Sequence, residues 1–178
     1  SEKLKTPILM RVTTRMAHSR AVVETTNTPK AQNEMSMPEN VNHFILLPAY
    51  AKRNYAELVE AQSTFVEESN QSGYNTYVRG DKPQKAIITT GIAYNYLMEC
   101  YPQGCPFPVL KISQYPIPKK LIRRMTDDCE FVLIAEEGQP FIEDQVRGVM
   151  PGNAVIKGRL TGELPRTGEL NPDLIKKA

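Results

Sequence analysis

The sequence predicts an α/β fold, doubly wound around a mostly parallel sheet. From residue 85 onward, four short β-rich runs alternate with stretches of helical pattern. Each run is mostly apolar, as expected for parallel strands that helices cover on both faces. The runs are Ala86–Thr90, Val109–Ile112, Phe131–Ala135 and Ala154–Ile156. Their alternation with helices indicates successive right-handed βαβ units.

Three helices are expected between these strands, at Ile92–Tyr101, Lys119–Thr126 and Phe141–Val149. Pro118 and Pro140 are expected at the first helical residue of the second and third, because proline there lacks only an N–H that would have no helical partner. In the third helix, the apolar spacing places Glu143 and Asp144 on the solvent side.

The first half of the chain has a different pattern. Pro7–Thr14 and Ala21–Thr25 are expected to be strands, and the polar stretch 26–42 an exposed loop. A connector helix is expected from Ala49 to about Ser69, packed on the α/β domain through a narrow apolar stripe. A strand close to one end and an isolated helix start, Asn171–Pro172, close to the other indicate a segment of a longer polypeptide.

Composition limits the function classes. The chain has 178 residues, 40% of them hydrophobic and 24% charged, so it is expected to fold as about one domain with an attached segment. A net charge of +2 is too balanced for a dedicated nucleic-acid binder. Because there is neither a long apolar run nor a signal-peptide core, we expect no membrane span and a cytoplasmic location.

No metal site is expected from the sequence. The three cysteines, Cys100, Cys105 and Cys129, form no CxxC pair, and His18 and His43 belong to no metal-binding motif. We therefore interpret the cysteines as reduced thiols. No complete catalytic constellation is present either, so no residue is assigned a catalytic role.

Three polar clusters follow predicted strands, where α/β proteins place ligand-binding loops. The first contains Thr13, Thr14, Arg15, His18 and Arg20, whose cations and hydroxyls suit a carboxylate or phosphate. Solvated cations and hydroxyls bonded to the backbone are the alternative.

The other two clusters are Thr90–Gly91 and Glu136–Glu137. At Thr90–Gly91, a helix start could bind an anion, or the turn could serve only for packing. Glu136 and Glu137 could act as acid or base or contact another subunit, and a solvated loop is the alternative.

Basic residues crowd the start of the predicted helix 119–126. Lys119, Lys120, Arg123 and Arg124 precede Asp127 and Asp128. Ion pairs four residues apart would make this a solvated, self-paired face. The alternative is a docking patch for a partner subunit or an acidic electron carrier.

Several stretches together resemble one family. They are RVTTRMAHSRAVVE (11–24), LLPAYAKRNYAELVE (46–60), AIITTGIAYNYLMEC (86–100), KISQYPIPKKLI (111–122) and FVLIAEEGQPFIEDQV (131–146). In this order they resemble the alpha subunits of indolepyruvate ferredoxin oxidoreductases, which are thiamine-diphosphate-dependent 2-oxoacid:ferredoxin oxidoreductases.

The resemblance implies a division of the chain and a reaction. Residues 1–24 would be the tail of a pyrimidine-binding domain, 25–84 a loop and connector helix, and 85–178 a domain like the transketolase C-terminal domain. The whole enzyme would decarboxylate arylpyruvates oxidatively with coenzyme A and ferredoxin, using thiamine diphosphate, magnesium and 4Fe-4S clusters. Its partners would be a beta subunit and a second alpha subunit.

The motifs that hold those cofactors are not found in this sequence. Gly80–Asp81 does not continue as a GDG motif, and no cluster-binding run of cysteines follows. The cluster from Thr13 to Arg20 is therefore carried over only as lying near cofactor or substrate. We expect an interface segment that is inactive alone. The alternative is a stand-alone small-ligand or nucleotide-binding module.

Overall fold

A computed structural model describes residues 2–25, 28, 37–127, 129–149 and 154–178. The chain divides into two compact units, Ser1–Ala51 and Lys52–Ala178. The first unit contains short elements, namely η1 (Glu2–Leu4), α1 (Thr14–His18) and η2 (Val41–Phe44).

Neither strand predicted for the first unit is present. Thr14 begins α1, and the rest of Pro7–Thr14 and all of Ala21–Thr25 have no regular structure. A strand requires a neighbouring strand for its backbone hydrogen bonds, and no described segment pairs with either one. Most of the predicted loop 26–42 lies outside the described residues.

The connector helix is confirmed as α2 (Pro48–Gln71), but its predicted apolar stripe is not buried. Tyr55, Leu58 and Val59 are 68%, 43% and 53% exposed. Burial begins near Phe65 and is complete at Ser69. Only the last turns of α2 therefore pack within the second unit.

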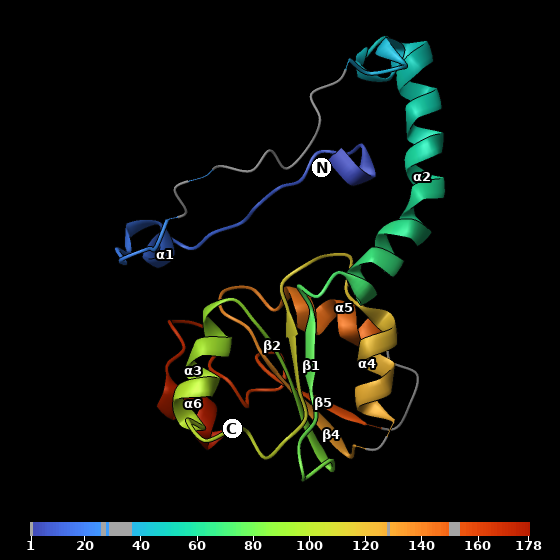
Figure 1. The fold of residues 1–178 in the computed structure, drawn as a ribbon. Coiled ribbons are helices and arrows are strands. Elements are labelled where there is room, and N and C mark those ends of the chain that lie inside the picture. Colours follow the sequence, from blue (N-terminus) through green and yellow to red (C-terminus); the bar gives the residue numbers. More distant parts are fainter. Residues whose placement is uncertain (1, 26–27, 29–36, 128, 150–153) are drawn as a thin grey trace. The chain divides into compact units, whose positions relative to one another are not determined.

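The second unit is built on a five-stranded sheet in the order β1-β3-β2-β4-β5 (Figure 1). The strands are β1 (Thr76–Val78), β2 (Lys85–Thr90), β3 (Val109–Ile112), β4 (Phe131–Ala135) and β5 (Val155–Lys157). The last four confirm the predicted strands and pair in parallel. β1 pairs antiparallel with β3 at the edge and was not predicted, because three residues carry too little pattern.

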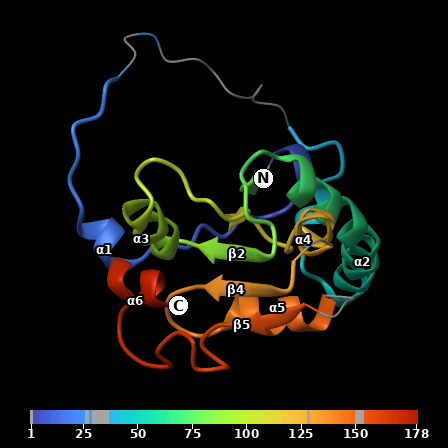
Figure 2. The same ribbon diagram turned by 90° about the horizontal axis from the view of Figure 1, so that it is seen from below.

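Helices cover both faces of this sheet, which confirms the α/β class (Figure 2). They are α3 (Ile92–Cys100) and α6 (Pro172–Lys177) on one face and α4 (Lys119–Thr126) and α5 (Phe141–Val149) on the other. α4 and α5 have the predicted bounds, but Pro118 and Pro140 lie directly before them and not at their first helical residue. α6 starts as predicted, with the Asn171 side chain accepting from the Leu174 N–H at 3.0 Å.

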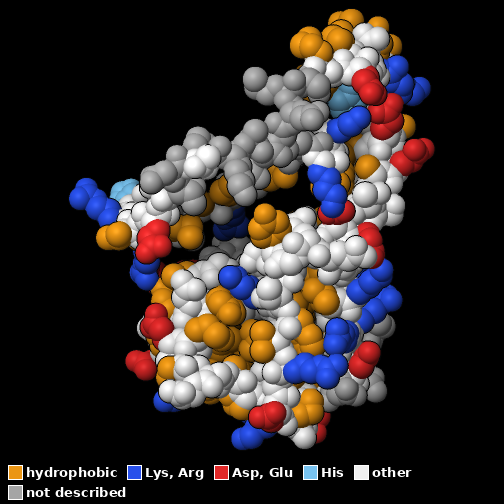
Figure 3. All heavy atoms as spheres, viewed as in Figure 1, with side chains coloured by type: hydrophobic (Ala, Val, Ile, Leu, Met, Phe, Trp, Pro, Cys, Tyr) orange, Lys and Arg blue, Asp and Glu red, His pale blue; other side chains and the backbone are white. Residues whose placement is uncertain are grey.

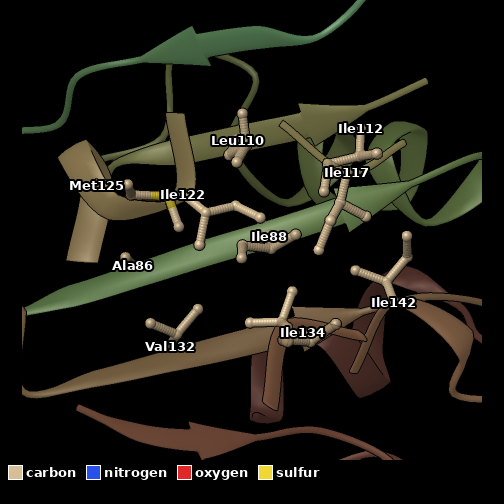
Figure 4. Close-up of a cluster of buried hydrophobic side chains, with 11 residues drawn as sticks. Ala86, Ile88, Leu110, Ile112, Ile117, Ile122, Met125, Val132, Ile134 and Ile142 are labelled. Carbon is tan, nitrogen blue, oxygen red and sulfur yellow. The ribbon is translucent and has the colours of Figure 1, made fainter. Parts of the chain in front are cut away.

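Each face has its own core. On the α4/α5 face, Ile88 of β2, Ile134 of β4 and Ile122 of α4 lie in one fully buried cluster (Figure 4). On the α3/α6 face, Ile87 packs with Leu97 of α3. Burial of alternate strand residues on opposite faces explains why these runs are mostly apolar.

Candidate functional site

The carboxyl ends of the parallel strands lie at one edge of the sheet, here called the carboxyl edge. The loops after β2, β3, β4 and β5 meet there, as in α/β folds that bind ligands outside strand ends. Two of the three predicted clusters, Thr90–Gly91 and Glu136–Glu137, are on these loops.

Thr90 and Gly91 form a tight turn between β2 and α3. The Thr90 hydroxyl donates to the Ile112 carbonyl at 2.8 Å, so it links β2 to β3 rather than facing a ligand. Gly91 has φ +57°, a conformation that favours glycine, and no atom lies within 4 Å of a Cβ built on it.

Glu136 is buried, not part of a solvated loop. Its side chain is 3% exposed and its carboxylate accepts the N–H groups of Ile142 at 2.8 Å and Glu143 at 2.9 Å. It therefore caps the start of α5. Burial raises the pKa of the Glu136 carboxyl, with Glu143 adding to the rise, although the two N–H bonds act in the opposite direction.

The predicted solvent exposure of Glu143 is wrong, whereas Asp144 is exposed as expected. The Glu143 carboxylate is fully buried, pairs with Arg147 at 2.8 Å and accepts the Leu160 N–H at 3.1 Å. A Cβ at Gly158 would lie 2.5 Å from the Glu143 Oε2, so this approach requires glycine. The helical pattern could not show this, because the covering segment comes from beyond β5.

That covering segment, residues 158–170, is fastened to the carboxyl edge by charged side chains. Buried Arg159 donates through Nε to the Glu136 carbonyl at 2.8 Å and through its other nitrogens to the carbonyls of Arg166 and Gly168. The Glu137 carboxylate accepts the Leu170 N–H at 2.9 Å. Both predicted acids thus hold structure in place.

A second polar centre joins α2 to the loop after β3. The buried side chain of Asn75 donates to the carbonyls of Ser69 and Gln114 and accepts the N–H groups of Ser113 at 2.7 Å and Gln114 at 2.9 Å. The buried Ser69 hydroxyl donates to the Pro116 carbonyl. No sequence signal marked Asn75, because it lies in a short polar stretch before an unpredicted strand.

Beyond these internal bonds, the carboxyl edge exposes two aromatic rings. Tyr115 and Phe141 are 46% and 49% exposed and meet edge to face, with ring centroids 5.4 Å apart. A rigid, internally bonded surface with exposed aromatics suits contact with another protein surface.

The cluster from Thr13 to Arg20 lies in the first unit. Thr13 caps α1 by accepting the Met16 N–H at 3.3 Å, and Thr14, Arg15 and His18 belong to α1 itself. All of these side chains and Arg20 are exposed. Nothing in the described residues tests the expectation that these side chains lie near a cofactor, and it stays a prediction.

Lys and Arg side chains gather over α4 on the face shown in Figure 3. Lys120 pairs with Glu67 of α2 at 2.5 Å, and Arg124 lies over the Tyr77 ring at 5.3 Å. The predicted Arg123–Asp127 pair is not among the ion pairs of the described residues, and Asp128 lies outside them. The face is therefore paired with neighbouring elements more than with itself.

The three cysteines are half-buried thiols that form no disulfide with one another. Burial raises the pKa of the Cys100 and Cys105 thiols, which lowers their reactivity. In the described part of the chain, no three His, Cys, Asp or Glu side chains are grouped so as to hold a metal ion.

The whole chain aligns with the indolepyruvate oxidoreductase subunit IorA of Methanothermobacter thermautotrophicus, with 29% identity, and with that of Methanothermobacter marburgensis, with 30%. IorA of Archaeoglobus fulgidus is 32% identical over 96% of the chain. The chain is homologous to a segment of IorA. It spans about 30% of the length of the two Methanothermobacter proteins and 27% of the Archaeoglobus protein.

This homology to IorA confirms the resemblance seen in the sequence. No family model matches the chain. Among the described helices, none has the length and apolar character needed to span a membrane.

Proposed function

We propose that this chain is the α/β segment of an indolepyruvate oxidoreductase, shaping a subunit interface and bracing the active site without performing the chemistry alone. Residues 1–24 would be the tail of a pyrimidine-binding domain, and residues 25–84 would be a loop and a connector helix. Residues 85–178 would form a domain like the transketolase C-terminal domain. The complete, cytoplasmic enzyme would oxidatively decarboxylate indolepyruvate, with coenzyme A accepting the acyl group and ferredoxin the electrons.

The observation that carries this proposal is the alignment of the entire chain with IorA from several archaea. The carboxyl edge adds physical support for an interface role. Glu136, Glu137 and Arg159 are each bonded to backbone groups there. Groups engaged in this way hold shape and are poorly placed to transfer protons to a substrate.

The described residues do not fit the cofactors that the family resemblance implies. They hold no metal-binding group of acids for magnesium and diphosphate. A Cβ at Gly80 would lie 2.2 Å from the Phe107 carbonyl carbon, so this turn is closed by protein backbone. Cys129 packs on one face of the sheet and Cys100 and Cys105 on the other, so the three cannot ligate one cluster. We assign no reaction step through these groups in this chain.

The partners proposed for this segment are a beta subunit and a second alpha subunit. Contacts with them would use the carboxyl edge, where Tyr115 and Phe141 expose aromatic area. Aromatic side chains are enriched in protein interfaces, which supports this choice.

The test is an assay of the complete polypeptide that carries this segment, purified with its companion subunit. We expect reduction of a one-electron dye with indolepyruvate and coenzyme A, at a higher kcat/KM than with pyruvate. An assembled preparation that fails to reduce the dye with any 2-oxo acid as substrate would contradict the proposal.

A further inference from the structure

We propose that the start of α3, together with Lys111 and Thr89, binds a phosphate group, either free or as a phosphate monoester. This site goes beyond the proposed function and does not depend on it. It rests on three features of the second unit that lie on one face of the sheet.

The first feature is an uncapped helix start. α3 has nine residues, and Gly91 before it provides no side-chain cap. The Tyr94 N–H reaches the Gly91 carbonyl at 3.3 Å, whereas the N–H groups of Ile92 and Ala93 have no hydrogen-bond partner in the described part of the chain. Free N–H groups and the positive end of the helix dipole attract anions. The space above Gly91 is open.

The second feature is the Thr89 hydroxyl. Thr89 is 1% exposed, and its Oγ1 has no hydrogen-bond partner among the described residues. Because side chains alternate along a strand, Thr89 points to the same face as Ile87, which packs under α3. Thr89 precedes Gly91, the residue before α3, by two positions. A buried hydroxyl without a partner is costly, and a bound oxyanion would satisfy it.

The third feature is the cation of Lys111. Lys111 is the ladder partner of Thr89 in β3, so both side chains point to the α3 face. Its Nζ lies 4.4 Å from the ring centroid of Tyr94, the third residue of α3. No carboxylate pairs with Lys111 among the ion pairs of the described residues. Lys111 is half-buried, and a long side chain held by a ring contact can turn toward a bound anion.

Together, these groups supply two backbone N–H donors, one hydroxyl donor and one ammonium. That set matches the acceptor oxygens and negative charge of phosphate, and Lys serves as a point charge for it. A carboxylate has fewer oxygens and less charge, so it should bind more weakly.

The site can be tested by titrating inorganic phosphate into the isotope-labelled 178-residue chain and following amide NMR signals. We expect saturable shifts concentrated at Gly91, Ile92 and Ala93, weaker with acetate, and methyl phosphate should cause the same shifts. Lys111→Met should weaken phosphate binding by about tenfold, the effect of one charged contact. Thr89→Val, which preserves shape, should weaken binding several-fold while leaving the chain folded.

Lys119→Met, which removes an exposed cation on α4, is the matched control and should leave phosphate affinity unchanged. The proposal is overturned if the amide shifts near Gly91 do not saturate. It is also overturned if Lys111→Met and Lys119→Met weaken binding equally, since phosphate would then be responding only to net charge.

Discussion

The carboxylate of Glu143 is fully buried, where it bonds to Arg147 one helical turn away and to Leu160 beyond β5. We expect Glu143→Ala to lower the free energy of unfolding by about 2–4 kcal/mol, because Arg147 and the Leu160 N–H lose their partner and a cavity forms. Asp144→Ala removes the exposed neighbouring carboxylate and should change it by less than about 0.5 kcal/mol. Urea denaturation compares the two, and equal losses would contradict this role for Glu143.

Two glycines in the same region should respond oppositely to one added methyl group. At Gly158 a Cβ would lie 2.5 Å from the Glu143 Oε2 and 3.1 Å from the Ile134 carbonyl oxygen, so Gly158→Ala should destabilise by about 1–3 kcal/mol. Gly148 lies in α5 with nothing within 4 Å, so Gly148→Ala should stabilise by up to about 1 kcal/mol. Thermal unfolding measures both changes. A stable Gly158→Ala variant would show that the close packing on Glu143 is not required.

The Glu136 carboxyl should make stability depend on pH. Burial raises its pKa above the usual 4.5, so the folded chain holds this proton more tightly than the unfolded chain. This contribution is fully present below pH 4.5 and is lost as pH rises through the folded pKa. The natural chain should therefore lose stability relative to Glu136→Gln over that window. Urea midpoints at a series of pH values measure the difference, and a constant difference, or one that shifts the other way, rejects the prediction.

At the scale of elements, Asn75 joins three parts of the second unit, the end of α2, β1 and the loop after β3. Asn75→Ala leaves buried N–H and carbonyl groups without partners and should cost about 2–4 kcal/mol. Asn95 is an exposed residue of α3, so Asn95→Ala is the matched control and should be nearly neutral. Chemical denaturation with helical circular dichroism follows both variants. Similar values for both would mean that Asn75 does not hold α2 in place.

The elements that could be predicted are those whose pattern is local. β2, β3 and β4 are mostly apolar on both faces because helices cover both sides, and that pattern is visible in each run. β5 is a short, mostly apolar run at the edge of the sheet. Pro7–Thr14 has a similar pattern but no described partner strand, and a strand exists only within a sheet. β1 could not be predicted for the opposite reason, since its three residues become a strand only through pairing with β3.

The position of the candidate site could be predicted from the sequence, but the hydrogen bonds of its residues could not. Strand ends located Thr90, Gly91, Glu136 and Glu137 at the carboxyl edge, because parallel strands end together. Their partners Ile112, Ile142 and Leu170 come from other elements, and no spacing rule connects them. The burial of Glu143 and Arg159 arises from the same long-range packing.

At the scale of the whole molecule, the chain corresponds to one segment of its relatives. It aligns throughout with IorA yet spans about 30% of the Methanothermobacter relatives. Its near-neutral charge of +2 suits a segment whose proposed partners are other subunits rather than nucleic acid. The internally bonded carboxyl edge agrees with a bracing role.

The most direct test of this account is a calorimetric titration of thiamine diphosphate, with and without magnesium, into the 178-residue chain and into the complete assembled enzyme. We expect magnesium-dependent, saturable binding to the assembled enzyme and none to the chain alone. Weak binding to the chain that is independent of magnesium would reflect only the phosphate site at α3. Saturable, magnesium-dependent binding to the isolated chain would contradict the claim that this segment braces the active site without holding the cofactor.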